Sequence, residues 1–483
     1  MESDQIVKPN KSSKKWRLIR QSTEPSNGSA YEYEDADLDE MYGRWIELPD
    51  MLLEEILALI IPKYRHEASQ VCRRWHQTFY ATRVWETFTL LERTLTKKTY
   101  SMYKGWTREL CGRKAQVCFL RVGSLFKRIV ITPLSDFYNL YEFLRVLNCF
   151  FVFYDHFPMP LLHTFEFTFA CEIRELTGVS IYGTGGQILD ILKAVVGNMK
   201  NLKHLKLNDL LLDVNEVAGL VEAVLSSSRD CLRTFELLNC SKIPHPIPEL
   251  AQFTNLSRLT VSAQHLDEES LLMIGGIGLA HLSIVQDPYT CEAEPVSSDA
   301  WKLVKEMAPK LRVTLEIRGS LRKTHIIQPY APVSRIKSSS PYSTLTPEFA
   351  NKLVMYYHKT MEVFDQRRLP RLHGSRSFHD RSDSSFVFLL RRCPRIHTLI
   401  IRERISTATL LLLMTIGKNL KNVLVRRNAL IKKSDWPKAD DWSPEFYQWL
   451  KTKSRSYDDV SAEVSKILGY PWRPLRDEEF KFM

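Results

Sequence analysis

The spacing Leu-x-x-Leu-x-Leu, with other large apolar residues replacing some of the leucines, recurs along this chain of 483 residues. Consecutive copies begin at Leu232, Leu256 and Leu279, at intervals of 24 and 23 residues, and another 24 residues separate the copies at Ile396 and Leu420. Amphipathic helical patterns lie between the copies. A strand and a helix that alternate at such intervals are typical of a solenoid, whose repeats stack side by side. The pattern therefore predicts an α/β fold, with a parallel sheet covered by helices on one side.

The predicted array is irregular. On the order of ten copies of the spacing are expected by chance in a chain this apolar, so the intervals matter more than the count. Near the start of the array the intervals lengthen to between 30 and 41 residues, which indicates insertions. Two polar stretches interrupt the pattern, and we expect residues 327–347 and 366–385 to form long surface loops.

Residues 44–85 form the most specific local pattern. An apolar stripe at helical spacing follows Leu48-Pro49 and ends before Pro62, and a second amphipathic helix with Val71, Cys72 and Trp75 in one stripe comes next. Two such helices cannot bury all their apolar faces in each other, and about 40 residues are too few for an independent core. A following domain or a partner protein must cover the surplus.

This segment resembles the F-box family, whose pattern is a Leu-Pro pair, a Leu- and Ile-rich helix, then Val-Cys-x-x-Trp and a later Val-Trp. The matching residues are Leu48-Pro49, Leu53, Ile56-Leu57, Val71-Cys72-Arg73-Arg74-Trp75 and Val84-Trp85. The family's usual Asp-Leu step between the helices is replaced by residues 63–66. The resemblance implies binding to the Skp adaptor of a Skp, cullin and F-box ubiquitin ligase, and through the adaptor to a cullin. The implied adaptor-binding residues are Leu48, Pro49, Leu52, Leu53, Ile56, Leu57, Val71, Cys72 and Trp75. The alternative is a plain helical hairpin that belongs to the downstream core.

The repeat region is similar to that of F-box proteins with leucine-rich repeats, although the Asn or Cys expected after the last Leu occurs only at Cys240 and Asn428. We therefore expect a disordered tail at residues 1–40, an F-box at 41–88, an irregular leucine-rich-repeat solenoid at 89–433 and an aromatic-rich helical cap at 434–483. Such a chain would be a non-enzymatic substrate receptor that captures a protein substrate on its repeats.

Positive charge is concentrated in residues 351–433, which hold 18 Lys or Arg against 5 Asp or Glu. A basic region suits an acidic or phosphorylated partner. The C-terminal aromatic residues either close the end of the solenoid or line a pocket beside this region. The candidate substrate-binding residues are Arg367, Arg368, Arg391, Arg392, Arg426, Arg427, Trp442 and Trp472. The alternative is a basic scaffold or nucleic-acid-binding repeat protein that acts outside a ligase, but the aromatic residues that stack on bases are sparse in this region.

Catalytic, metal and cofactor motifs are absent from the sequence. Gly183-Thr184-Gly185-Gly186 lacks the Lys-Ser/Thr of a phosphate-binding loop, and the nine cysteines show no zinc-like spacing. We therefore expect no cofactor and no metal. There is no apolar run of 18 residues and the N-terminus is polar, so we expect neither a membrane span nor a signal peptide, and a location in the cytoplasm or nucleus.

Overall fold

The computed structural model describes residues 48–103, 105–153, 159–171, 183–320, 325–370 and 374–481. The chain divides into two units, residues 1–53 and residues 54–483, and nearly all described residues belong to the second. The predicted tail at residues 1–40 lies outside the described residues, as do residues 41–47 of the predicted F-box.

Four short helices open the described chain: α2 (Asp50–Leu59), α3 (Pro62–Ser69), α4 (Arg73–Phe79) and α5 (Thr82–Trp85). Pro62 takes the first position of α3, where its missing N–H costs nothing. The second predicted helix is divided in two, because Cys72 is extended, with φ of −156° and ψ of 170°, and forms the N-cap of α4.

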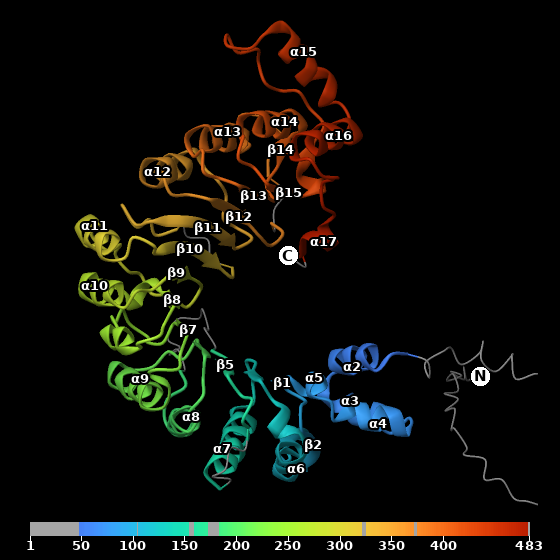
Figure 1. Cartoon of the computed structure of the whole chain (residues 1–483), viewed down its shortest axis with the longest axis vertical. Helices are drawn as coiled ribbons and strands as arrows, with labels where there is room; N and C mark the ends of the chain where they lie inside the picture. The colour runs from blue at the N-terminus through green and yellow to red at the C-terminus, as the bar shows by residue number, and fades with distance from the viewer. Residues whose placement is uncertain are drawn as a thin grey trace, which may run out of the picture. The chain divides into compact units, whose positions relative to one another are not determined.

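A parallel sheet of twelve strands runs through residues 87–425 of the described chain (Figure 1). Its strands are hydrogen-bonded in sequence order, which confirms the predicted α/β solenoid. They are β1 (Thr87–Leu90), β4 (Arg128–Ile131), β5 (Thr164–Thr168), β6 (His204–Asn208), β7 (Thr234–Leu238), β8 (Arg258–Ser262), β9 (His281–Gln286), β10 (Arg312–Arg318), β11 (Val333–Ser339), β12 (Val363–Gln366), β13 (Thr398–Ile401) and β15 (Asn422–Val425).

Two small sheets accompany the main one. Strands β2 (Thr96–Ser101) and β3 (Gly105–Leu110) form an antiparallel hairpin, and β14 (Ile405–Ser406) pairs with β16 (Leu430–Ile431) in parallel. The hairpin is an insertion between β1 and β4 and accounts for part of the long first interval of the repeat pattern.

Helices cover the outer face of the main sheet (Figure 1). Most begin at a residue whose side chain can cap the first turn, as at Asp267, whose carboxylate accepts a hydrogen bond from the Ser270 N–H at 2.9 Å. These helices are α6 (Gly112–Val122), α7 (Phe137–Phe153), α8 (Gln187–Gly197), α9 (Val214–Ser228), α10 (Glu268–Gly276), α11 (Ser298–Met307), α12 (Pro347–Tyr357), α13 (Asp383–Arg392) and α14 (Thr407–Ile416). Short 3₁₀ turns are η2 (Gly123–Leu125), η3 (Pro248–Gln252), η4 (Ala263–His265) and η5 (Arg427–Ala429).

The core lies between the strands and these helices. In β8, Leu259 and Val261 are buried while Arg258 at the start of the strand is exposed, and β4 and β6 alternate in the same way. Because successive side chains of a strand point to opposite faces, the residues between the buried ones face away from the helices. The sheet therefore offers a row of side chains from every strand on its inner face.

The prediction of a long surface loop at residues 327–347 was wrong, because this stretch contains β11. The strand pairs with β10 on one side and β12 on the other, so the ladder satisfies its backbone groups although its sequence is rich in Ser. Ser338 and Ser340 are buried with it. Between β12 and α13, in contrast, the described residues of the second predicted loop form neither helix nor strand.

The C-terminus is helical, as predicted, with α15 (Pro444–Lys453), α16 (Tyr457–Leu468) and α17 (Asp477–Lys481). Helices α15 and α16 pack against α14. Trp472 is buried and its indole N–H donates to the carbonyl of Val423 in β15 at 2.6 Å. The Leu475 N–H donates to the Val425 carbonyl at 2.8 Å, so the C-terminal segment covers the free edge of the last strand.

Candidate interaction surfaces

Large apolar side chains are exposed on the N-terminal helices. Leu59 at the end of α2 is 86% exposed, Val71 between α3 and α4 is 67% exposed, and Ile61 is about half exposed. Met51, Leu52 and Tyr64 on these helices are also exposed. Several large apolar side chains exposed within one short stretch of the chain mark an interaction surface more often than single exposed residues do.

The predicted adaptor-binding residues separate into two groups. Leu52, Pro49, Val71 and Cys72 are exposed, and Leu48, Ile56 and Trp75 are partly exposed. Leu53 and Leu57, in contrast, have no exposed surface. These two side chains support the packing of the helices and offer no surface to a partner, which corrects their place in the predicted set.

Arg65 explains the departure from the usual sequence between the two motifs. Its buried guanidinium donates to the carbonyls of Ala58 at 2.8 Å, Ile60 at 2.7 Å and Val84 at 2.5 Å. The last carbonyls of a helix have no partner within the helix, so Arg65 satisfies those of α2 while it ties α2 to α5. Within residues 63–66, Arg65 thus supplies buried hydrogen bonds that connect α2 to α5.

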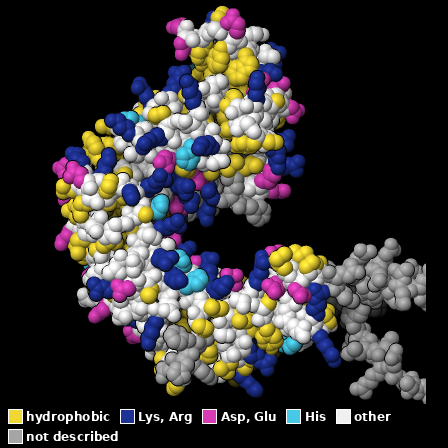
Figure 2. All heavy atoms as spheres, viewed as in Figure 1, with side chains coloured by type: hydrophobic (Ala, Val, Ile, Leu, Met, Phe, Trp, Pro, Cys, Tyr) yellow, Lys and Arg dark blue, Asp and Glu magenta, His cyan; other side chains and the backbone are white. Residues whose placement is uncertain are grey.

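A basic row crosses the inner face of the sheet. Arg258, His281 and Arg312 are direct cross-strand neighbours on β8, β9 and β10, and Arg335 lies on the next strand, β11. All four are exposed. Figure 2 shows Lys, Arg and His side chains gathered on this inner face. We call Arg258, His281, Arg312 and Arg335 the basic row.

The charges of the basic row affect the pKa of His281, which is itself part of the row. Burial lowers the pKa of His281, and the positive charges of Arg258, Arg312 and Arg335 lower it further. Only Arg312 of the row forms an ion pair among the described residues, with Glu362 at 3.2 Å. The row is therefore a largely uncompensated positive strip.

The predicted substrate-binding residues are not brought together. Arg391 and Arg392 lie in the last turn of α13, on the helical side of the sheet. Arg367 and Arg368 follow β12, and Arg426 and Arg427 follow β15, so these four lie at the carboxyl ends of strands. Trp442 lies beside α15, where its ring packs edge-on against the ring of Phe446 with the ring centres 5.6 Å apart. Trp472 is buried and offers no surface to a partner.

Several of these arginines already form hydrogen bonds with carboxylates of their own chain. Arg426 donates two hydrogen bonds of 2.7 Å to the carboxylate of Asp477, and Arg367 donates to Asp365 at 2.9 Å. The buried Arg402 donates to the carbonyls of Arg367 at 2.6 Å and Arg368 at 3.1 Å. The side chains of Arg367 and Arg426 thus belong to a structural network at this edge of the sheet.

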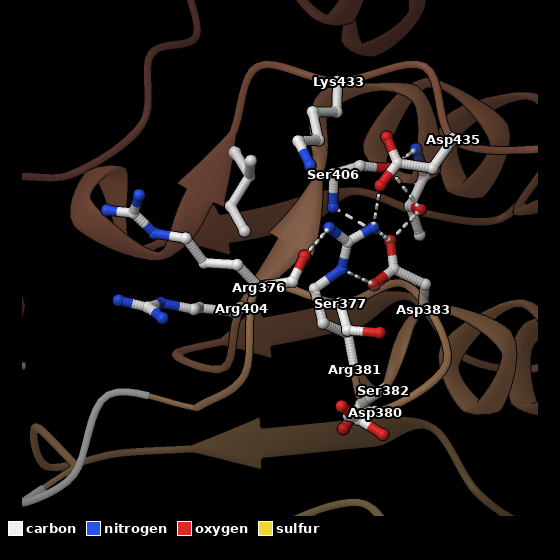
Figure 3. A network of polar contacts seen from close by, with 12 residues as sticks. Arg376, Ser377, Asp380, Arg381, Ser382, Asp383, Arg404, Ser406, Lys433 and Asp435 are labelled. Atoms are coloured by element: carbon white, nitrogen blue, oxygen red, sulfur yellow. Dashed lines mark hydrogen bonds and ion pairs between the residues drawn. The ribbon is translucent and has the colours of Figure 1, made fainter.

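A second network fixes the segment before α13 (Figure 3). The Arg381 guanidinium is fully buried and lies 2.7 Å from the Asp383 carboxylate and 2.8 Å from that of Asp435. The Ser406 N–H donates to Asp383 at 2.9 Å. In Figure 3 the side chains of Arg376 and Arg404 extend away from this network, while the Arg376 carbonyl accepts a hydrogen bond of 3.1 Å from Arg381. A segment without helix or strand is held in place by buried charges.

Within the described ranges, no group of three or more His, Cys, Asp or Glu side chains is arranged to hold a metal ion. Among the same residues, no helix combines the length and apolarity that crossing a bilayer requires.

The fold defines an α/β repeat solenoid with a separate set of short helices at its start. Residues 45–87 match the family model for the F-box domain. The chain therefore contains an F-box domain, and a repeat region follows it in the sequence.

Two solved structures are similar to the chain in fold. The crystal structure of the Rad7 and Elc1 complex in yeast is 11% identical, with a TM-score of 0.39 over 85% of this chain and 96% of that one. An internalin from Listeria monocytogenes is 9% identical, with a TM-score of 0.25 over 68% of this chain and 86% of that one. No curated protein matches the chain in sequence.

The sequence carried signals for two features that we missed. Leu59 comes three residues after the partly exposed Ile56, so helical spacing places it on the side of Ile56 and away from the fully buried Leu57. The members of the basic row on β8, β9 and β10 each stand directly before the first buried residue of the strand, as Arg258-Leu259, His281-Leu282 and Arg312-Val313. A comparison of repeats position by position would have found this row.

Proposed function

We propose that this protein is the substrate-recognition subunit of a Skp-cullin-F-box ubiquitin ligase. It has no catalytic role of its own: it binds a Skp-type adaptor, and through the adaptor a cullin, and it holds a protein substrate on the repeats. Proximity then makes ubiquitin transfer to the substrate effectively intramolecular.

The observation that carries the proposal is the exposed apolar surface of the F-box domain. Leu59, Ile61 and Val71 are exposed to water in the isolated chain. Burial of their apolar surface against a partner would contribute about 25 cal/mol of binding free energy for each Å². The buried Leu53 and Leu57 hold the helices that carry these side chains. A domain with a supported core and an exposed apolar face suits adaptor binding.

The basic row supports a substrate of matching charge. Cross-strand neighbours in a sheet lie roughly 4.8 Å apart, so the row spans an extended strip that suits an acidic or phosphorylated segment of a protein. Complementary charge of this kind speeds association and selects partners. Nucleic acid would be drawn to the same charge, and binding that falls steeply with salt and ignores protein sequence would favour it.

Co-purification from cells tests the adaptor role. In the variant Leu59→Glu/Val71→Glu, two exposed apolar residues of the F-box become charged, and the adaptor and cullin should disappear from the purified material. The matched control is Met273→Glu/Leu303→Glu, which changes two exposed apolar residues on α10 and α11. The proposal fails if both variants retain the adaptor equally.

A charge-reversed row tests the substrate surface separately. The variant Arg258→Glu/Arg335→Glu should retain adaptor and cullin but lose proteins that the wild-type chain captures. Reversal of Arg391 and Arg392 to Glu on the helical side serves as its control. Identical sets of captured proteins in all three samples would remove the basic row from the proposal.

A further inference from the structure

A cavity of about 580 Å³ lies where the F-box helices α3 and α4 meet the first repeat. Its walls also include the base of the β2–β3 hairpin and one face of α6. The volume falls in the range of about 300 to 1,000 Å³ that is typical of small-molecule sites. None of its lining residues belongs to the basic row or to the exposed set of Leu59, Ile61 and Val71, so the proposed function does not use the cavity.

The inner walls are apolar. Phe79, Trp85 and Phe88 form one wall, and Val117 and Val122 from α6 form another. The indole N–H of Trp85 is already satisfied by the Phe79 carbonyl at 2.7 Å, so the ring offers only apolar surface. An apolar chain or ring would be buried here without leaving a polar group unpaired.

The mouth is basic. Six Lys or Arg side chains line the cavity, and none of its described lining residues is Asp or Glu. Two of the six have hydrogen bonds only to neutral groups: Lys114 donates to the Thr96 carbonyl at 3.1 Å and Arg121 to the Tyr80 hydroxyl at 3.5 Å. None of the six forms an ion pair with another described residue. They are Lys63, Arg93, Arg108, Arg113, Lys114 and Arg121.

A further buried cation lies behind the wall. The Arg65 guanidinium lies 4.9 Å from the centre of the Trp85 ring and donates only to backbone carbonyls. The one thiol near it stays neutral, because burial raises the pKa of Cys118 to about 12. Among the described residues, no acidic side chain lines the cavity or pairs with its six cations.

We propose that this cavity binds a small amphiphilic anion, a single apolar chain or ring system that carries one carboxylate or phosphate. The apolar body lies against Trp85 and Val117, and the anionic head lies among the cations at the mouth. Both halves are needed: a purely apolar ligand leaves the cations uncompensated, and a small hydrophilic anion leaves the apolar walls exposed to water.

Calorimetric titration of the full chain tests the proposal, with dodecanoate and dodecyl phosphate below their micelle concentrations as probes. We expect a Kd on the order of 10 µM for the preferred head group. Dodecanol, which has the same chain without the charge, should bind about tenfold more weakly. Preference between the two anions identifies the head group. Equal binding of dodecanol and both anions, or no binding of any of them, overturns the proposal.

Variants locate the site. Arg113→Glu/Lys114→Glu should weaken anion binding about tenfold, while Arg391→Glu/Arg392→Glu, an adjacent cation pair at the end of α13, should leave it unchanged. Val117→Trp fills the cavity and should abolish binding of all three probes, whereas Leu120→Trp, one turn further on α6 and outside the cavity, should not.

A soluble peptide of alternating Leu and Glu is the competing occupant, and binding of that peptide without binding of the amphiphiles refutes the proposal. Adaptor binding should be unchanged in every variant, so the failure of this site and the failure of the proposed function are distinguishable.

Discussion

Leu57 and Leu59 stand two residues apart on helix α2 and differ completely in exposure: Leu57 has no exposed surface, and Leu59 is 86% exposed. The same residue type thus serves as core at one position and as surface at the other. This contrast separates what holds the F-box domain together from what it offers to a partner.

Truncation of the two leucines should have very different effects on the free energy of unfolding. Leu57→Ala removes a buried side chain and leaves a cavity, so it should lower the free energy of unfolding by about 2 to 5 kcal/mol. Leu59→Ala should change it by less than about 0.5 kcal/mol. Urea denaturation followed by the local fluorescence of a label on the F-box measures both. Equal losses in the two variants would contradict the division into core and surface.

Removal of the buried Arg381 should loosen the segment before α13. The variant Arg381→Gln leaves the Asp383 and Asp435 carboxylates without their cation, at a cost of about 3 to 5 kcal/mol. Hydrogen exchange should then rise in residues 374–383 and 433–435. The control is Arg376→Gln, an exposed arginine five residues earlier, whose exchange should match the wild type. Unchanged exchange in the Arg381 variant would show that the network does not hold this segment.

Loss of Trp472 should open the C-terminal edge of the sheet. Its ring is buried against β15, so Trp472→Ala should cost about 3 to 5 kcal/mol. Helix α16 should become sensitive to limited proteolysis, while Trp442→Ala, which changes a partly exposed ring in the same region, should have a small effect. Equal proteolysis of the two variants would argue that Trp472 does not fasten the cap.

His265 should make the solenoid sensitive to acid. Its Nε2 accepts a hydrogen bond from the Cys240 N–H at 3.0 Å, and burial lowers the pKa of His265 to about 4. The unfolded chain binds a proton near pH 6.5 and the folded chain does not, so this contribution to stability is complete above pH 6.5 and is lost as the pH falls towards 4. The loss amounts to at most about 3 kcal/mol.

The variant His265→Gln isolates this effect. Its amide oxygen can accept the same hydrogen bond but does not titrate, so the drop in stability between pH 6.5 and 4 should be smaller than in the wild type. Burial raises the pKa of Asp209 to about 6, which acts in the opposite direction in both proteins and cancels in the comparison. Identical pH profiles of the two proteins would contradict the assignment to His265.

Local patterns were enough to predict the repeats and the F-box, since pairs such as Leu259 and Val261 show alternation at the period of a strand. They could not show β11, because only Val333 and Ile336 of its 7 residues are large and apolar, and its pairing with β10 and β12 is set by the fold. Nor could they show that Arg426 is held by a carboxylate of its own chain, since Arg426 and Asp477 are 51 residues apart. The sequence reveals which residues are charged, and the fold decides which charges remain available.

Binding of the purified chain to a purified Skp-type adaptor tests the central claim most directly. Calorimetry should give tight binding for the wild type and for the control Met273→Glu/Leu303→Glu. For Leu59→Glu/Val71→Glu, binding should weaken at least about a hundredfold, because two central apolar contacts become buried charges. Equal affinity of all three proteins, or no binding by a folded wild-type chain, would contradict the account.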